Sequence, residues 1–254
     1  MVLAYPVIGL FRSGRIAPAL FLSAIGLSFV INMTFVVVSR TALVTMPVML
    51  AVFALLHLGW RSRLVILCAA IVLGGLAFAA SPKLRSTIGT FSLEYRGYEE
   101  QNLPTSIGQR LEFWRKSLRF IADAPLLGHG TGSIKRLFEQ ASTGPAGGVS
   151  AEVIANPHNQ TLNVAVQWGA LGVIVLYAMW LSHLMLFRHD GLMAWIGLMV
   201  VVQNFFTSLF NSHIFDFTEG WMYVLGVGIA GGKMLVAGGR AVSLGTASSV
   251  ELDS

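Results

Sequence analysis

The sequence predicts an all-α integral membrane protein with about six transmembrane helices and one large, partly helical loop outside the membrane. Three observations predict this fold. Of the 254 residues, 55% are hydrophobic and only 11% are charged, whereas about a quarter of the residues are charged in an ordinary soluble domain. Several runs of about twenty residues, the length that spans a bilayer, are almost free of charge. Most charged side chains lie instead in the polar stretch 81–160.

The N-terminal membrane part, residues 1–80, contains three predicted spans. Met1 to Phe11 is apolar but too short to span alone, and Arg12 ends it. Each later span ends at a polar or cationic turn, and together they cover residues 16–38, 43–60 and 64–80. The third stops where Ser81, Pro82 and Lys83 begin the long loop.

The loop, residues 81–160, contains one predicted amphipathic helix. Between Gln109 and Ile121, apolar residues recur at three- and four-residue spacing. The predicted apolar face is Leu111, Trp114, Leu118 and Ile121, and the predicted polar face is Glu112, Arg115, Lys116 and Arg119. Pro125 is expected to stop this helix, and the glycines at 128, 130 and 132 favour an open turn. Pro157 favours a helix start, which would place His158 and Asn159 in the first turn of the next span.

The C-terminal membrane part, residues 161–237, contains three further predicted spans at about 162–187, 192–210 and 221–236. Residues 238–254 are small and polar, and we expect a disordered cytoplasmic tail there. Cations in short loops stay preferentially on the cytoplasmic side, while long loops cross largely regardless of charge. If the spans alternate, both termini are cytoplasmic and the long loop is on the opposite side. Arg40 is the one short-loop cation that breaks this pattern.

Composition and residue spacing argue against several function classes. The net charge is +5, but the cations are scattered over several loops and form no basic stripe, so we expect no nucleic-acid partner. Cys68 is the only cysteine, which excludes an internal disulfide and a cysteine metal site. His213, Asp216 and Glu219 have no recognised metal-ligand spacing, so they rank only as secondary candidates for binding. We expect neither a metal nor a cofactor.

Three residues are the main candidates for chemistry. Arg40 lies at the outer end of the first span, Arg110 in the loop helix and His158 at the head of the fourth span. Two guanidinium groups at the membrane boundary would suit a lipid-linked phosphate or diphosphate. A histidine beside them could act as a general base, and helix-start amides at His158 and Asn159 would add a weak anion site.

The same residues also have plain structural interpretations. Arg40 alone could extend to lipid headgroups. A single arginine on a loop helix is commonly solvated, and a single histidine before a span is commonly interfacial. The glycine-rich segment around His129 lacks the lysine and the strand of a phosphate-binding loop, so we interpret it as a turn.

The order of these motifs resembles a known family. Ser39-Arg40-Thr41-Ala42 is followed by Arg110 with Phe113-Trp114, then by Pro125-Leu126-Leu127-Gly128-His129-Gly130, and then by His158-Asn159 with Leu162, Gly169 and Gly172. Spread over residues 40–228, this combination resembles the O-antigen ligase and O-antigen polymerase superfamily of bacterial envelope proteins. The ordered set is more specific than any one motif.

The resemblance implies a GT-C-like membrane glycosyltransferase of the bacterial inner membrane, with its large loop in the periplasm. Its donor would be a glycan on undecaprenyl diphosphate, and its acceptor a hydroxyl of a glycan, of lipid A core or of another molecule. By family analogy, Arg40 and Arg110 would hold the diphosphate and His158 would take the proton from the acceptor. Arg115 and Asn159 would help to bind substrate. Membrane lipids and other polysaccharide assembly proteins are the remaining expected partners.

Several alternatives stay open on the sequence. The transfer chemistry fits a ligase, an O-antigen or exopolysaccharide polymerase, or a protein O-glycosylating ligase equally well. A noncatalytic export or scaffold protein is a different class, although the spans lack the charged or paired broken segments that transporters carry. Family members usually have around ten to twelve spans, so with six we expect either the C-terminal part of such a protein or a short form that needs a partner. Residues 1–11 resemble the end of a preceding span.

Overall fold

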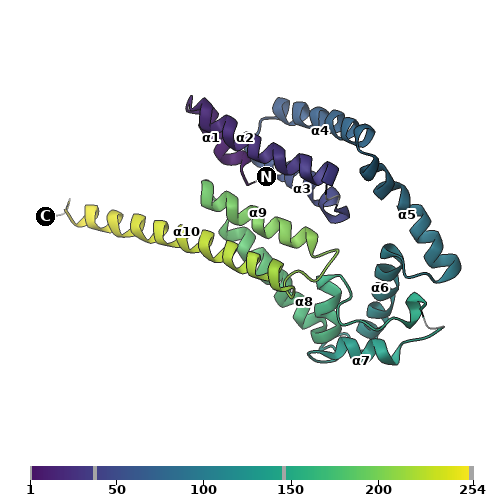
Figure 1. The fold of residues 1–254 in the computed structure, drawn as a ribbon. Coiled ribbons are helices and arrows are strands. Elements are labelled where there is room, and N and C mark those ends of the chain that lie inside the picture. The colour runs from purple at the N-terminus through teal and green to yellow at the C-terminus, as the bar shows by residue number, and fades with distance from the viewer. Residues whose placement is uncertain (1, 37–38, 145–146, 252–254) are drawn as a thin grey trace.

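The computed structural model describes residues 2–36, 39–144 and 147–251, with side chains described as far as Val236. Every regular element within these ranges is a helix, which confirms the predicted all-α class. Helices α4 and α5 form a long arc along one side, α6 and α7 lie at one end, and α10 extends past the other helices (Figure 1). Residues 37 and 38, the end of the first predicted span, lie outside the described ranges.

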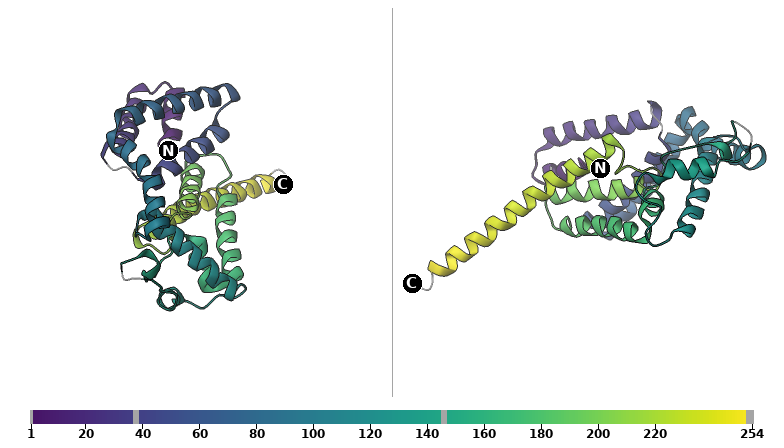
Figure 2. Two further views of the ribbon diagram at one scale, coloured as in Figure 1. Left: turned by 90° about the vertical axis from the view of Figure 1, so that its right-hand side faces the viewer. Right: turned by 90° about the horizontal axis from the view of Figure 1, so that it is seen from below.

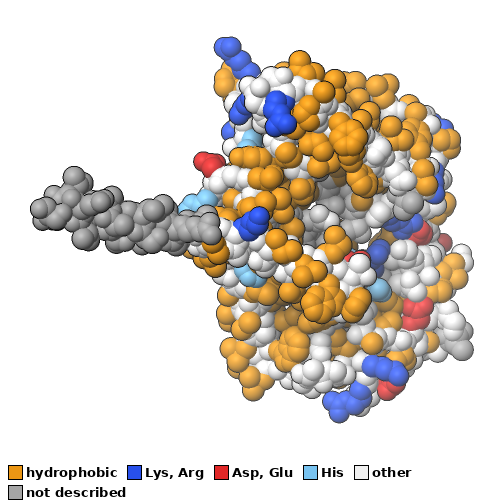
Figure 3. Space-filling model, turned by 60° about the vertical axis from the view of Figure 1, so that its left-hand side comes forward, with side chains coloured by type: hydrophobic (Ala, Val, Ile, Leu, Met, Phe, Trp, Pro, Cys, Tyr) orange, Lys and Arg blue, Asp and Glu red, His pale blue; other side chains and the backbone are white. Residues whose placement is uncertain are grey.

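Four helices are long and apolar enough to cross a membrane. Three of them follow the short helix α1 (Ala4–Arg12): α2 (Ile16–Ile31, extended by a π turn to Val36), α3 (Arg40–His57) and α4 (Trp60–Ala80). The fourth is α8 (Gln160–Leu186). Helix α4 buries no residue, and hydrophobic side chains cover much of the face shown in Figure 3. An all-round apolar surface of this kind is typical of contact with lipid.

Hydrogen bonds join the ends of α2, α3 and α4. Ser81, which follows α4, donates through Oγ to the Thr34 carbonyl near the end of α2 (2.9 Å). Lys83 reaches the Val36 carbonyl of the same segment. At the opposite end, Arg63 of α4 donates to the Leu58 carbonyl just past the end of α3 (2.9 Å), where a cation meets the negative end of a helix. The end of α2 and the end of α4 therefore lie together, on the side where the long loop begins.

The loop contains more helix than the sequence predicts. Helix α5 (Pro82–Gln101) fills its first twenty residues. It begins with Ser81 as the cap, whose Oγ accepts from the Leu84 amide (3.2 Å), and with Pro82 in the first turn. Helix α6 (Ser106–Asp123) confirms the helix predicted over 109–121, and α7 (Ser133–Gln140) and a short turn at Val149–Ala151 complete the loop. Their core consists of apolar side chains from α6, α7 and this turn, with Tyr98 of α5 packed against them: Phe113, Phe120, Ile134, Leu137, Phe138 and Val149, together with Val166 of α8.

The predicted faces of α6 are wrong in part. Glu112 and Lys116 are only 1% and 3% exposed, whereas Leu118 is exposed. Both buried charges have partners. Glu112 accepts from Arg115 Nη2 (2.7 Å) and from the Tyr98 hydroxyl (3.0 Å), and Lys116 Nζ donates to the Ser150 carbonyl (2.6 Å). Burial by itself would raise the pKa of Glu112, but the hydrogen bonds from Arg115 and Tyr98 hold it below its usual value.

Helix α8 is broken at Gly169, where φ is 60° and ψ is −154°. The segment 125–130 fills the break through four backbone hydrogen bonds of 2.8–3.3 Å, from His129 N to Val166 O, Gly130 N to Gln167 O, Ala170 N to Pro125 O and Leu171 N to Leu126 O. The broken turn leaves amides and carbonyls unpaired within the helix, and this segment satisfies them. The glycine-rich segment is therefore a turn, as predicted, and its role is to complete α8.

Helices α8, α9 (Leu192–Thr207) and α10 (Phe217–Glu251) pack around a second core that includes Trp180, Phe187 and Tyr223. The two views in Figure 2 show α10 projecting beyond this bundle. Helix α9 is shorter than a typical span, so the predicted count of six spans stays a prediction. Residues 238–251 of the predicted disordered tail belong to α10, which is helical as far as Glu251, and residues 252–254 lie outside the described part of the chain.

Candidate functional site

Arg40 begins α3 and is held by a carboxylate from α5. Its Nη1 donates to Glu94 Oε2 at 2.8 Å, and its Nη2 bonds Glu94 Oε1. This is the two-pronged contact that a guanidinium makes with a carboxylate or a phosphate. Nη2 also donates to Thr90 Oγ1 (3.3 Å), and the guanidinium lies 4.9 Å from the centre of the Phe91 ring. Arg40 therefore has a specific anion partner within the chain and does not simply extend to headgroups.

Glu94 connects Arg40 to the start of α6. Its Oε2 accepts from the Ile107 amide (3.2 Å), and its backbone carbonyl accepts from Thr105 Oγ1 (2.9 Å). Arg40 lowers the pKa of Glu94 by hydrogen bonding and by its charge, against the opposing effect of burial, and Arg110 lowers it further. Glu94 thus pairs with Arg40, and the charge of Arg110 also favours its ionised form.

Arg110 lies on α6, half-buried and only partly bonded. Its Nη1 donates to Ser106 Oγ (3.2 Å). Its Nε is buried and has no hydrogen-bond partner among the described residues. Burial lowers the pKa of Arg110, and the nearby positive charge of Arg40 lowers it further. A guanidinium with a buried free N–H beside a second guanidinium is poised to receive an anion.

His158 approaches the same helix from the chain segment before α8. Its ring stacks on Phe113, one turn after Arg110 on α6, with the ring centres 6.2 Å apart. Trp114, the next residue, donates from Nε1 to the Pro157 carbonyl (3.1 Å). One face of α6 therefore carries Arg110 and also positions His158. Arg110 thus lies on the N-terminal half of α6, and Arg40, through Glu94, and His158, through Phe113, are each linked to the same part of that helix.

The backbone at His158 differs from the sequence prediction. Helix α8 begins at Gln160, not at Pro157, and His158 precedes it with a left-handed φ of 54°. The His158 amide donates to Asn156 Oδ1 (2.9 Å), so it does not form part of the predicted helix-start anion site. Asn156 Oδ1 also accepts from Ser212 Oγ (2.7 Å). These contacts hold a conformation that is unfavourable for a residue other than glycine.

The His158 ring contacts the turn between α9 and α10. Its Nδ1 lies 2.9 Å from Asn211 Oδ1, and Asn211 Nδ2 donates to Asp216 Oδ2 (3.0 Å). The other ring nitrogen, Nε2, has no partner in the described part of the chain. Two further hydrogen bonds hold the same turn in place. Asn159 Nδ2 donates to the Leu209 carbonyl (3.0 Å), and Gln160 Oε1 accepts from the Ile214 amide (3.0 Å).

Arg115 and Asn159, the second-tier candidates, have structural partners. Arg115 forms a two-pronged pair with Glu112, through Nη2 and Nε at 2.7 and 3.0 Å. Asn159 caps α8, since its Oδ1 accepts from the Leu162 amide (3.0 Å). Their described contacts account for both side chains without a ligand, and a role in binding substrate stays a prediction for each.

Comparison with known proteins decides the family. A family model described as O-antigen ligase matches residues 24–177, which is more than half of the chain. The chain belongs to the O-antigen ligase family. A search of the curated proteins finds no match. The match confirms the resemblance inferred from the ordered motifs, and its range contains Arg40, Arg110 and His158. At the level of the family, the chain is a glycosyltransferase-like membrane enzyme with polysaccharide and lipid-linked substrates.

The sequence analysis missed two residues of this O-antigen ligase site. The sequence gives an indirect indication of Glu94. In the predicted topology, Arg40 lies in a short loop on the side opposite the other short-loop cations, so its position needs a partner such as an acidic residue to explain it. Asn211 has no such indication, since an amide in a turn is common. Its importance appears only when the turn is placed against His158.

The secondary candidates His213, Asp216 and Glu219 do come together. Each offers one metal-ligating atom, and these atoms lie within 4.8 Å of one another. Asp216 already accepts from Asn211, and its Oδ2 lies 3.4 Å from His213 Nδ1. These contacts place Asp216 in the hydrogen-bond chain that leads to His158.

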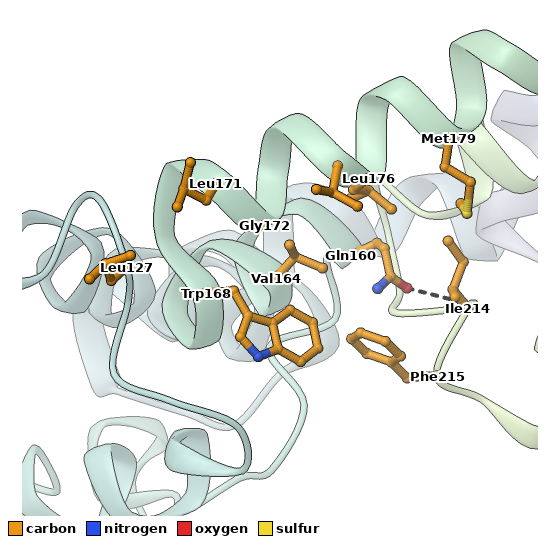
Figure 4. Close-up of a pocket in the computed structure, with 11 residues that line it drawn as sticks. Leu127, Gln160, Val164, Trp168, Leu171, Gly172, Leu176, Met179, Ile214 and Phe215 are labelled. Atoms are coloured by element: carbon orange, nitrogen blue, oxygen red, sulfur yellow. Dashed lines mark hydrogen bonds between the residues drawn. The ribbon is translucent and has the colours of Figure 1, made fainter.

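An apolar cavity of about 510 Å³ opens beside this site. Its walls come from the segment before α7, from α8 and from the turn after α9: Leu127, Gln160, Val164, Trp168, Leu171, Gly172, Val175, Leu176, Met179, Ile214 and Phe215. Gln160 is the one polar wall residue, and it is bonded to Ile214, as Figure 4 shows. The cavity therefore lies against the helix that begins two residues after His158.

Proposed function

We propose that the protein is an O-antigen ligase-like glycosyltransferase that moves a glycan from undecaprenyl diphosphate to an acceptor hydroxyl on the periplasmic face of the bacterial inner membrane. One observation carries the proposal. Arg110 of α6 has a buried N–H without a partner among the described residues, Glu94 joins Arg40 to the Ile107 amide at the start of the same helix, and Phe113 of that helix stacks on His158. Two arginines, one carboxylate and an imidazole are thus linked at the N-terminal half of α6.

Arg40 and Arg110 hold the diphosphate in this proposal. The Arg40 fork, which contacts the Glu94 carboxylate in the structure, has the geometry that also fits phosphate oxygens. Once the diphosphate takes the place of Glu94 on the Arg40 fork, the two positive charges stabilise the negative charge that grows on the diphosphate as it leaves, a contribution that can reach several kcal/mol in a water-poor site. The apolar cavity beside the site suits part of the lipid chain.

His158 acts as the general base through Nε2. It takes the proton of the acceptor hydroxyl while that oxygen forms a bond to the anomeric carbon. The bond from this carbon to the diphosphate breaks, and its electron pair leaves with the lipid diphosphate. Attack from the face opposite the leaving group inverts the anomeric centre. All atoms are accounted for without a metal ion or a nucleotide sugar.

A complementation assay tests the proposal. His158→Ala and Arg110→Ala are expressed in a strain that lacks the cognate enzyme, and membrane insertion is checked by blotting. Arg119→Ala is the matched control, because Arg119 is an exposed cation on the same helix. We expect the two site variants to abolish the surface polysaccharide and the control to retain it. Normal polysaccharide in both site variants would contradict the proposal.

The product pattern separates the related activities. A ligase transfers a finished glycan to its acceptor, whereas a polymerase extends the glycan, so a polymerase defect removes the ladder of lengths while short products remain. An O-antigen or exopolysaccharide polymerase and a protein O-glycosylating ligase are therefore alternatives within the same chemistry. A noncatalytic export or scaffold protein would tolerate both site substitutions.

A further inference from the structure

We infer that Asn211 is a positioning residue that, together with Asp216, fixes which ring nitrogen of His158 carries the proton. The inference rests on the proposed function of His158 as a base. Its starting point is the contact chain from His158 Nδ1 to Asn211 Oδ1 (2.9 Å) and from Asn211 Nδ2 to Asp216 Oδ2 (3.0 Å). Neither Asn211 nor Asp216 lies within the part of the chain that the family model matches.

The chemistry of the three groups allows one arrangement of hydrogen atoms. An ionised carboxylate accepts hydrogen bonds and donates none, so the end of the Asn211 amide that faces Asp216 is the NH₂ group. The amide oxygen is then turned toward His158. Because an oxygen there can only accept, Nδ1 of the neutral ring carries the proton, and Nε2 keeps its lone pair. This is the tautomer that a base acting through Nε2 requires.

The surrounding contacts make the arrangement rigid. Phe113 stacks on the ring of His158, and Asn156 fixes its amide. Ser212, next to Asn211, donates to Asn156 and accepts from Asn163 Nδ2 (3.1 Å). The turn that carries Asn211 is therefore bonded on both sides to the segment that carries His158.

The arrangement also suits the charged state of the base. When Nε2 takes a proton from the acceptor, the ring becomes positive, and Nδ1 continues to donate to Asn211. The Asp216 carboxylate lies one residue further along the chain of contacts and stabilises that charge. The other charged or titratable groups on the elements that contact the ring are His213, which lies against Asp216 in the same turn, and Arg110, one turn before Phe113 on α6. Because Arg110 is also positive, a carboxylate in the contact chain of His158 has a clear electrostatic role.

Two variants separate this role from a structural one. Asn211→Leu has nearly the same shape but cannot accept from Nδ1. The exchange variant, Asn211→Asp combined with Asp216→Asn, keeps both hydrogen bonds but moves the carboxylate next to the ring. A carboxylate in direct contact raises the pKa of an imidazole. The exchange should therefore restore the correct tautomer and shift the pH at which the base becomes active.

The experiment measures glycan transfer by the full chain in proteoliposomes, with lipid-linked glycan extracted from a strain that lacks the cognate enzyme. We expect Asn211→Leu to lower kcat/KM by at least about tenfold, and by no more than the roughly 10²–10⁴-fold that a general base supplies, with little change in the donor KM. The exchange variant should recover most of this loss, and the acid limb of its pH profile should move upward by about one unit or more.

A buried asparagine elsewhere gives the matched control. Asn204 of α9 accepts from Trp180 Nε1 (3.1 Å) and has no contact with His158. Asn204→Leu should lower thermal stability but leave the pH profile unchanged. If His158→Ala is inactive and Asn211→Leu has normal kcat/KM, or if the exchange variant keeps the original acid limb, this inference is wrong and the proposed function stands. Full activity of His158→Ala would overturn both.

Discussion

The break in α8 makes a sharp prediction about Gly169. A Cβ at this position would lie 2.3 Å from the Leu126 carbonyl carbon and 2.6 Å from the Leu127 amide nitrogen. Both are backbone atoms, so no side-chain rotation can relieve the clash. The φ of 60° with ψ of −154° also lies in a region that only glycine adopts readily. Gly169→Ala should therefore disrupt the junction between α8 and the segment 125–130.

Gly169→Ala should lower the free energy of unfolding in two ways. The backbone strain contributes roughly 1–3 kcal/mol. If the clash moves the segment 125–130 away, the four backbone hydrogen bonds of the junction are lost as well, at about 0.5–1.5 kcal/mol each. The total is about 3–9 kcal/mol, which is comparable to the whole free energy of unfolding of a typical domain. We expect Gly169→Ala to insert poorly or to melt well below the unmodified protein in detergent.

Two other glycines provide graded controls. Gly130 has a φ of 91°, but a Cβ there meets no atom within 4 Å, so Gly130→Ala should cost only the strain. Gly74 lies inside α4 with open space around it, and Gly74→Ala should be neutral or slightly stabilising, because alanine favours a helix by about 1 kcal/mol. Melting temperatures that fall from Gly74→Ala to Gly130→Ala to Gly169→Ala would support the packing account. A Gly169→Ala variant as stable as Gly130→Ala would refute it.

Three further predictions concern the loop. Glu112→Gln leaves Lys116 buried without its carboxylate and should lower the free energy of unfolding by about 3–5 kcal/mol. Glu139→Gln breaks an exposed pair, in which Lys135 is 68% and Glu139 52% exposed, and should lower it by under about 1 kcal/mol. Similar melting temperatures of the two variants would contradict this difference. The folded pKa of Glu94 lies below its ordinary value of 4.5, so its stabilising effect is present above that pH and is lost as pH falls through the folded pKa. Melting of the unmodified protein should therefore fall more steeply below about pH 4.5 than melting of Glu94→Gln, and parallel curves would count against the ion pair. Asn159→Ala should destabilise the start of α8 by about 1 kcal/mol, because it removes the cap. Asn159→Asp keeps the cap and loses the hydrogen bond to the Leu209 carbonyl, so it should melt between Asn159→Ala and the unmodified protein; an Asn159→Ala variant as stable as the unmodified protein would contradict the cap.

The sequence predicts the apolar helices well because the bilayer requires a simple pattern, about twenty residues with little charge. Helix α5 was missed for a different reason. Its composition is mixed and polar, and its start signal, Ser81 followed by Pro82, is interpreted in the sequence only as the end of a span. The spacing of apolar residues also does not show which side of α6 is buried. Glu112 and Lys116 look like a solvated pair until Tyr98 and Ser150, distant in sequence, are placed against them.

In the candidate site, too, the residue types can be predicted from the sequence and their contacts cannot. Arg40, Arg110 and His158 are predictable as residue types that suit a diphosphate and a base, and the ordered motifs single them out. Their contacts are not predictable, since Glu94 is 54 residues from Arg40 and Asn211 is 53 residues from His158. The start of α8 illustrates the limit at the local level. Pro157 favours a helix start, but the Asn159 side chain supplies the cap, and the helix begins only at Gln160.

The central claim is that Arg40 and Arg110 bind one diphosphate, and a double-mutant cycle on donor binding tests it most directly. The Kd of undecaprenyl diphosphate is measured for the purified unmodified chain, Arg40→Ala, Arg110→Ala and the double variant, with Arg119→Ala as control. Because a hydrogen bond to a charged group contributes about 1.5–3 kcal/mol, we expect each single change to weaken binding by roughly ten- to hundredfold. The effects of the two changes should not be additive. An unchanged Kd in both single variants would contradict the account.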